Sequence, residues 1–279
     1  MSFCYINGSY KNNIDALISV EDRGFNFSDG IYEVMGFRNG KLLNFERHLK
    51  RLSKSLIDLQ IKAPFSNENS LKIIIHHLLK LNDVYSGFLY LQITRGTAKR
   101  NHLFPSKVKP NIVIFTFSKV GLDKIKKGVN VGLTKDQRWM RCDIKSISLL
   151  ANVLLKQKAL KKKAFECLMK DNNGFITEAT TSNVWILKNN VLITTPLTSN
   201  ILAGVTRKKL IQLAKRMKIT VLEKKFKETD VLSANGVFIT NSSAIILEAN
   251  KLNNKKLNVN QNGIIKSIKT EMFKVISNE

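Results

Sequence analysis

One lysine, Lys145, combines a reactive side chain with an informative position in the chain. It lies in RWMRCDIKSISLLANVLLKQKA, residues 138–159, where a polar stretch gives way to an apolar one. Apolar residues recur at helical spacing from Ile147 to Leu154, which predicts a helix over 146–161 with one buried face. Lys145 is then expected at the helix start, where the field of a helix lowers an amine's pKa and favours the free nucleophile. The alternative is an ordinary surface lysine in a lysine-rich chain.

Two segments of the chain are suited to binding a phosphate group. Arg47 and Arg51 are four residues apart on a predicted amphipathic helix and so share one face, where a guanidinium can hold a phosphate through two hydrogen bonds. In ILAGVTRKKLIQLAKRM, Gly204 and Thr206 come directly before a helical run, with Thr206 as the expected N-cap. Exposed N–H groups at such a helix start bind phosphate. A solvated basic face and a capped helix without a ligand remain the alternatives.

Further polar side chains suit a small acid or need a partner of their own. Arg100 and His102 are two apart in an extended segment, so they project to one side and could hold the carboxylate of a small acid. Tyr32 and Val34 share one face of a predicted strand by the same spacing. Glu178, in the strand-like segment GFITEATTSN, requires a cation or an N–H group beside it if it is half-buried.

The hydrophobic pattern predicts a mixed α/β (α+β) protein. We expect an opening strand and turn over 3–10, strands over 31–37, 87–94 and 111–118, and helices over 45–59, 70–81, 146–161 and 206–217. The 70–81 helix is expected to bury Ile73, Ile74, His77 and Leu78. Turns are expected at 38–41, 172–174 and 188–190, which are rich in Asn and Gly. The pattern breaks near 119–127, where GLDKIKKG begins at Gly121, and this predicts a domain boundary, with a smaller domain over 1–120 and a larger one over 121–279.

Length and composition narrow the class of protein. A chain of 279 residues exceeds the usual size of one domain, and 43% hydrophobic residues support a substantial core. No run of about 18 apolar residues is present and the N-terminus lacks the apolar stretch of a signal peptide, so we expect a soluble, cytoplasmic protein without a membrane partner. The three cysteines, Cys4, Cys142 and Cys167, have no C-x-x-C spacing, and His76 and His77 have no partner at metal-ligand spacing. No disulfide framework and no metal site are expected.

The formal net charge of +25 raises the possibility of a nucleic-acid-binding protein. The positive charge, however, is mostly lysine spread along the whole chain, with small clusters at 161–163 and 224–227 and no basic tail. Net charge informs solubility and steering rather than fold. We therefore expect a solvated lysine-rich surface and no nucleic-acid partner.

The order and composition of these segments resemble the class IV aminotransferases, which are fold-type IV pyridoxal-phosphate enzymes, and among them the D-amino-acid aminotransferases. The resemblance covers nearly the whole chain and is carried by DRGFNFSDGIYEV, RHLKRLSKS, TRGTAKRNHLFP, RWMRCDIKSISLLANVLLKQKA, ITEATTSNVWIL, LAGVTR and VFITNSSA. It implies a two-domain fold with pyridoxal 5′-phosphate (PLP) between the domains. The Lys145 segment and the Arg-x-His-x-x-Pro piece are its most specific parts.

The resemblance implies a role for each candidate residue at the cofactor. Lys145 forms the internal aldimine and, once displaced, moves the proton between the substrate Cα and C4′ of the cofactor. Glu178 pairs with the pyridine nitrogen, so that the ring accepts electrons from the carbanion. The remaining cofactor-binding residues are implied to be Arg51, Val205, Thr206 and Ser242 at the phosphate and Leu202 against the ring.

The same resemblance implies how the substrate is recognised. Tyr32, Arg100 and His102 hold its α-carboxylate, with Val34 also lining the substrate site, and the arginine and histidine come from the neighbouring subunit of a homodimer. This implies transamination of D-amino acids, of the type D-alanine plus 2-oxoglutarate to pyruvate plus D-glutamate. The chain departs from the family after VFITNSSA, where IILEAN replaces a usual Pro-Val pair, and at Asn241, where a small residue or serine is usual.

Three functions therefore remain open. The first is transamination of D-amino acids. The second keeps the cofactor and changes the substrate, as in branched-chain L-amino-acid aminotransferases or aminodeoxychorismate lyases of the same family; the paired Arg100 and His102 favour the first. The third is a basic nucleic-acid-binding protein without catalysis, which predicts strongly salt-dependent binding.

Overall fold

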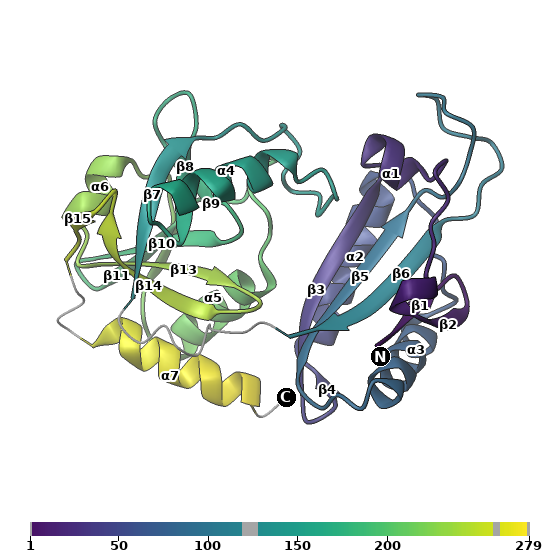
Figure 1. Ribbon diagram of the computed structural model, residues 1–279. Helices are drawn as coiled ribbons and strands as arrows, with labels where there is room; N and C mark the ends of the chain where they lie inside the picture. The colour runs from purple at the N-terminus through teal and green to yellow at the C-terminus, as the bar shows by residue number, and fades with distance from the viewer. Residues whose placement is uncertain (1, 119–127, 259–262, 278–279) are drawn as a thin grey trace. The chain divides into compact units, whose positions relative to one another are not determined.

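A computed structural model describes residues 2–118, 128–258 and 263–277 of the chain. The chain forms two compact units, each with its own sheet (Figure 1). Of the described residues, unit 1 contains 2–118 together with the short segment Ile144–Ser148, and unit 2 contains 128–143, 149–258 and 263–277. The domain boundary predicted at 119–127 lies outside the described residues. The segment that carries Lys145 packs with unit 1, whereas the sequence places it among residues of the larger, second domain.

Unit 1 is a six-stranded antiparallel sheet with two long helices, in the strand order β2-β1-β6-β5-β3-β4. Its elements are β1 (Phe3–Ile6), β2 (Ser9–Asn12), α1 (Arg23–Phe27), β3 (Gly30–Arg38), β4 (Lys41–Leu42), α2 (Phe45–Asp58), α3 (Glu68–Leu81), β5 (Gly87–Thr94) and β6 (Asn111–Phe117). Alternate residues of β3, among them Ile31, Met35 and Phe37, join Leu49 and Leu52 of α2 in one apolar core. Tyr32 and Val34 lie on the opposite, half-buried face, as predicted.

The turn between β3 and β4 follows directly from the sequence. Phe37 pairs with Leu42 and Arg38 with Lys41, which leaves a two-residue connection. Asn39 and Gly40 both have positive φ, 48° and 73°, and Asn-Gly is the pair that best tolerates this conformation. The predicted hairpin is confirmed.

Unit 2 is a nine-stranded mixed sheet in the order β12-β11-β10-β13-β14-β7-β8-β9, with β15 paired to β14. Its strands are β7 (Val129–Lys135), β8 (Glu166–Lys170), β9 (Ile176–Ala179), β10 (Asn183–Lys188), β11 (Val191–Thr194), β12 (Val221–Glu223), β13 (Gly236–Asn241), β14 (Ile245–Leu252) and β15 (Lys255–Lys256). Its helices are α4 (Leu150–Lys161), α5 (Val205–Arg216), α6 (Glu228–Ser233) and α7 (Ile264–Ser277). Within this unit, α4 lies along β7 and β8, while α5 and α7 pack against each other next to β13 and β14 (Figure 1).

The helix predicted over 146–161 begins four residues later, at Leu150. Residues 145–147 instead pair with β3 through one isolated bridge, Ile31 to Ser146: Tyr32 N–H donates to Lys145 O (3.0 Å) and Ile147 N–H donates to Gly30 O (3.1 Å). This pairing holds the backbone of Lys145 against β3, so Lys145 does not stand at a helix start. The prediction that a helix start lowers the pKa of Lys145 was therefore wrong. Lys145 stays a candidate because its side chain is a primary amine.

Two predicted helix faces also differ from the structure. In α4 the residues at Leu150 and Leu154 are 72% and 58% exposed, and the helix buries Leu155 and Ala159 instead. In α3 the buried residues are Leu71, Ile75, Leu78 and Leu79, whereas Ile73 and His77 are exposed. Both helices carry apolar residues on more than one face. In such helices the spacing of apolar residues does not show which face is buried.

The three cysteine thiols are buried and unpaired with one another. Among the described residues, no helix is both long enough and apolar enough to span a bilayer.

Candidate active site

The Lys145 side chain lies on the half-buried face of the unit 1 sheet. Its Nζ sits 4.1 Å from the centre of the Tyr32 ring, a cation–π contact. Its backbone N–H donates to Oγ of the buried Ser55 in α2 (3.2 Å), and the preceding Ile144 belongs to the unit 1 core. Ser55 and Tyr32 thus hold the Lys145 backbone through its N–H and its carbonyl, while the side chain keeps its flexibility. A fixed backbone of this kind positions an amine for reaction.

Tyr32 belongs to a row of aromatic rings on the same sheet face. Its ring stacks on Tyr90 with centroids 5.6 Å apart, and Tyr90 stacks on Phe115 at 4.9 Å. The strand register makes the row, because Tyr90 pairs across β5 and β6 with Phe115 and across β3 and β5 with Val34. Tyr32 and Val34 therefore lie on a flat, mostly apolar surface that leads to the Lys145 amine.

Arg51 forms a buried ion pair with Glu33 inside unit 1 and does not lie on a solvated basic face. Its Nε and Nη2 donate to the two carboxylate oxygens of Glu33, both at 2.7 Å, and His48 Nδ1 lies 2.7 Å from the same carboxylate. Burial alone raises the pKa of Glu33, but Arg51 and then His48 outweigh it and hold this carboxyl well below its usual range. Burial also lowers the pKa of His48; Glu33 opposes this shift, and the cations Arg51 and Lys145 add to it, so that the pKa lies below its ordinary value. The pair fixes where the Arg51 guanidinium lies.

This buried cluster predicts acid sensitivity. Glu33 and His48 both have folded pKa values below their ordinary values of 4.5 and 6.5, so their stabilisation is present above those values and is lost as the pH falls. Glu33→Gln is expected to lower the free energy of unfolding by about 2 kcal/mol at pH 7. The loss should shrink at pH 3.5 to 4.5, as measured by urea denaturation. Glu46→Gln, which removes an exposed pair with Lys72, serves as control and should cost about 1 kcal/mol or less. If Glu33→Gln lowered the free energy of unfolding equally at pH 7 and at pH 3.5 to 4.5, the prediction would be contradicted.

Arg100 and His102 are brought together on one ring. The Arg100 guanidinium carbon lies 5.0 Å from the centre of the Phe27 ring, and the His102 ring lies 5.3 Å from it. Both side chains are exposed, in a segment without regular secondary structure. Unit 1 therefore presents a guanidinium and an imidazole that both contact one aromatic ring, and groups of these two types suit a carboxylate.

Glu178 in β9 is a buried carboxylate of unit 2 that accepts hydrogen bonds from three residues. It is 4% exposed; Arg138 donates to its Oε2 (2.5 Å), and Asn183 Nδ2 and Leu202 N–H donate to its Oε1 (2.7 and 3.1 Å). Burial raises the pKa of Glu178, while Arg138 and the Leu202 N–H oppose that shift. The partner that the sequence required is thus an arginine, held in turn by Asp136 through two hydrogen bonds.

The start of α5 lies next to Glu178. Val205 is the first helical residue and Gly204 the N-cap, so the N-cap prediction for Thr206 is wrong: Thr206 is the second residue of the helix. Glycine is needed at 204 because a Cβ there would lie 2.1 Å from Oδ1 of Asn183. No side chain caps this helix and no acidic residue occurs in its first turn. Its first N–H groups and positive dipole end therefore suit an anion.

Ser242 lies in the turn between β13 and β14. The preceding residue, Asn241, organises that turn: its Oδ1 accepts from Ser243 N–H (3.0 Å) and Ala244 N–H (2.7 Å), and its Nδ2 donates to Ser182 Oγ (2.9 Å). The departure from the family pattern at Asn241 thus has a structural role. It ties the turn that carries Ser242 to the strand start that follows Glu178.

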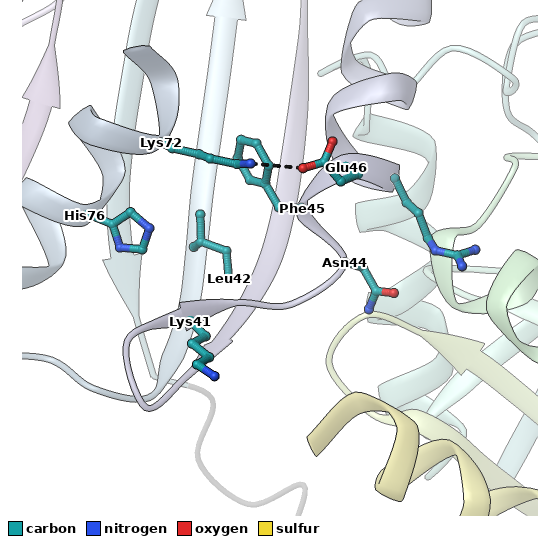
Figure 2. A pocket seen from close by; sticks show the side chains of 8 residues that line it. Lys41, Leu42, Asn44, Phe45, Glu46, Lys72 and His76 are labelled. Atoms are coloured by element: carbon teal, nitrogen blue, oxygen red, sulfur yellow. Dashed lines mark hydrogen bonds and ion pairs between the residues drawn. The ribbon is translucent and has the colours of Figure 1, made fainter. Parts of the chain in front are cut away.

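A separate cavity of about 620 Å³ opens in unit 1 between β4, the start of α2 and α3 (Figure 2). It is lined by Lys41, Leu42, Asn44, Phe45, Glu46, Arg47, Lys72 and His76. Lys72 pairs with Glu46 at 3.0 Å across it (Figure 2). None of the predicted cofactor or substrate residues lines this cavity, although Arg47, considered for phosphate, does.

Three residues that contact the candidate site residues or their neighbours were not predicted from the sequence. His48 and Ser55, on α2, hold Glu33 and the Lys145 backbone, and Arg138 holds Glu178. The requirement for a cation beside Glu178 could be read from its strand. Which of the 46 lysines and arginines fills that place could not.

Comparison with known proteins decides the family. A sequence model described as "Amino-transferase class IV" matches residues 30–252. The chain belongs to the class IV aminotransferase family. This class IV aminotransferase is 36% identical to a D-alanine aminotransferase of Bacillus licheniformis over 275 residues, covering 98% of this chain and 96% of that one. It is 38% identical to a D-alanine aminotransferase of Staphylococcus epidermidis over 267 residues, covering 95% and 94%.

Solved structures share the fold of this class IV aminotransferase. The branched-chain amino acid aminotransferase of Escherichia coli superposes with a TM-score of 0.89 at 20% identity, covering 99% of this chain and 94% of that one. A putative 4-amino-4-deoxychorismate lyase of Legionella pneumophila gives a TM-score of 0.85 at 23% identity, covering 94% and 96%. At these identities the likeness concerns the fold alone. The predicted two-domain fold-type IV architecture is confirmed.

Proposed function

We propose that this protein transaminates D-amino acids with PLP, converting D-alanine and 2-oxoglutarate to pyruvate and D-glutamate. The observation that carries the proposal is the identity of 36 to 38% to D-alanine aminotransferases over at least 94% of either chain. The structural neighbours named as branched-chain enzymes share only about 20%. Substrate preference follows side chains rather than fold, so the nearer sequences weigh more.

We propose that PLP is the cofactor and that the groups named below bind it. Unit 1 offers the Lys145 amine and Arg51, and unit 2 offers the Glu178 carboxylate and the first N–H groups of α5. These groups fit PLP by type: an amine for its aldehyde, a buried carboxylate for its ring nitrogen, and an uncapped helix start for its phosphate. The proposed cofactor-binding residues are Lys145, Arg51, Glu178, Leu202, Val205, Thr206 and Ser242.

When bound, PLP supplies an electron sink for the carbanion at the substrate Cα. The protein's own groups do the rest. The Lys145 amine takes and returns the proton at Cα, a role worth roughly 10²- to 10⁴-fold for a positioned group. The Glu178 carboxylate keeps a proton on the ring nitrogen, and the Tyr32 row of rings excludes water beside the amine.

Tyr32, Arg100 and His102 are proposed to hold the α-carboxylate of the substrate, with Val34 along the same sheet face. We propose a homodimer in which each subunit lends Arg100 and His102 to its neighbour. A carboxylate held at one place decides which face of Cα meets the Lys145 amine, and this geometry selects one enantiomer. The proposed partners are therefore amino acids, 2-oxo acids and a second copy of the chain.

The second candidate keeps PLP and uses branched-chain L-amino acids, which the fold of the structural neighbours favours. Turnover of 2-oxoglutarate with D-alanine and with L-leucine separates the two. We expect turnover with D-alanine and very little with L-leucine, and the reverse would move the protein to the branched-chain group. A protein without cofactor absorbance and with strongly salt-dependent nucleic-acid binding would contradict both.

A further inference from the structure

Arg23, at the start of α1, is a buried arginine whose side chain binds backbone carbonyls of the loop that carries Arg100 and His102. Its side chain is 4% exposed, and its Nε donates to Asp29 Oδ2 at 2.8 Å. Its Nη1 donates to the carbonyl oxygens of Asn101 (2.6 Å) and Leu103 (3.3 Å). These two carbonyls belong to the residues on either side of His102. The guanidinium therefore fixes the peptide groups that aim this imidazole.

Phe27, one helical turn after Arg23, completes the contact. Its ring has the Arg23 guanidinium at 4.8 Å, the Arg100 guanidinium at 5.0 Å and the His102 ring at 5.3 Å from its centre. One aromatic side chain thus touches both residues proposed to hold the substrate and the arginine that holds their backbone.

The support behind Arg23 is rigid. Asp29 also accepts from Arg95, at 2.7 and 3.1 Å, and Arg95 donates in turn to the carbonyls of Leu59 and Gln60 at the end of α2. The Arg23–Asp29–Arg95 network therefore connects the loop to the sheet and to α2. The loop itself, residues 98–110, has no helix or strand of its own, so its position depends on such side-chain contacts.

We infer that Arg23 and Phe27 are positioning residues for substrate recognition: they hold Arg100 and His102 in the geometry that binds the substrate carboxylate. This rests on the role proposed above for Arg100 and His102. Neither Arg23 nor Phe27 touches the substrate. They act on affinity by restricting a loop that otherwise samples many arrangements, each of which binds the carboxylate less well.

The test uses Arg23→Lys and Phe27→Leu in the holoenzyme. Lysine keeps a charge for Asp29 but lacks the planar fork that reaches two carbonyls as well, and leucine keeps an apolar side chain without the ring. For both variants we expect KM for D-alanine to rise roughly tenfold. Arg23→Lys loses at least one charge-assisted hydrogen bond to the loop, and Phe27→Leu loses the ring that contacts Arg100 and His102. The kcat at saturating D-alanine and the cofactor absorbance should stay close to those of the unsubstituted protein.

A second readout does not depend on activity. Trypsin cleavage after Lys99 and Arg100 should be faster in both variants, because the loop opens more often. Ile75→Val, which removes one methyl group from the unit 1 core far along α3, is the control for lost stability. It should lower the melting temperature without changing KM or the cleavage rate at these two sites.

The inference and the proposed function fail in different ways. If the unsubstituted protein does not turn over D-alanine, the proposed function fails, and the trypsin comparison still decides whether Arg23 holds the loop. Unchanged KM and unchanged cleavage in Arg23→Lys and Phe27→Leu would overturn the inference. So would a joint fall of kcat, cofactor absorbance and melting temperature, which would mark both residues as supports of the fold alone.

Discussion

Replacement of Lys145 by alanine is expected to lower the rate of transamination by about 10⁴-fold or more. The amine is the proposed group that takes and returns the proton at Cα, and a positioned proton-transfer group contributes roughly 10²- to 10⁴-fold by itself. The same change also removes the amine proposed to bind the cofactor covalently, and the loss of that preorganised geometry adds to the effect. The measurement is the rate of the D-alanine half-reaction followed by the change in cofactor absorbance.

Lys72→Ala is a matched control, because Lys72 also places its amine over an aromatic ring of unit 1, 4.9 Å from the centre of Phe45. It should leave the rate close to that of the unsubstituted protein. Borohydride reduction of the holoenzyme followed by peptide mapping should label Lys145. Label on another lysine, or an alanine variant that retains most of its activity, would refute the assignment.

Lys145 shows a limit of sequence reasoning. Its type and its surrounding motif made it the candidate, and this assignment stays a prediction, but the physical reason first offered, a helix start, was wrong. The apolar periodicity from Ile147 is real, yet Tyr32 and Gly30 of β3 capture the backbone of the same residues. A tertiary strand pairing between residues more than a hundred positions apart overrides a local helical pattern.

The elements fixed by local chemistry were predicted well. The β3–β4 hairpin follows from Asn39-Gly40, and the strands β5 and β6 follow from their alternation. The polar contacts within each unit were not predicted, because a sequence states that a buried carboxylate needs a partner without naming it. Arg51 shows this: its spacing suggested a free phosphate-binding face, and the structure gives it Glu33.

The lysine-rich surface illustrates a different limit. The net charge of +25 describes the whole chain and does not indicate which basic residues lie at the site. The arginines of the proposed site, Arg23, Arg51 and Arg138, are largely buried and paired with Glu or Asp. Net charge therefore gave no guide to them, whereas the need to pair buried carboxylates did.

Glu178→Gln is expected to lower kcat by roughly 10²- to 10³-fold while leaving the cofactor bound. The proposed role of the carboxylate is to keep a proton on the ring nitrogen, and loss of one preorganised electrostatic partner has about this effect in other active sites. Glutamine keeps the shape and can still accept from Asn183 and the Leu202 N–H. Its amide then faces the Arg138 guanidinium, donor against donor, so the free energy of unfolding should fall as well.

Glu166→Gln separates the two effects of this change. Glu166 in β8 is equally buried in unit 2 and accepts from the hydroxyls of Thr180, Thr181 and Ser182, so its amide variant also loses buried charge-assisted bonds. Both variants should lower the melting temperature, but the large fall in kcat should belong to Glu178→Gln, with a changed pH dependence of the cofactor spectrum. Equal kinetic losses in the two variants would mean that Glu178 serves the fold of unit 2 through Arg138 and Asn183, and that another group holds the ring proton.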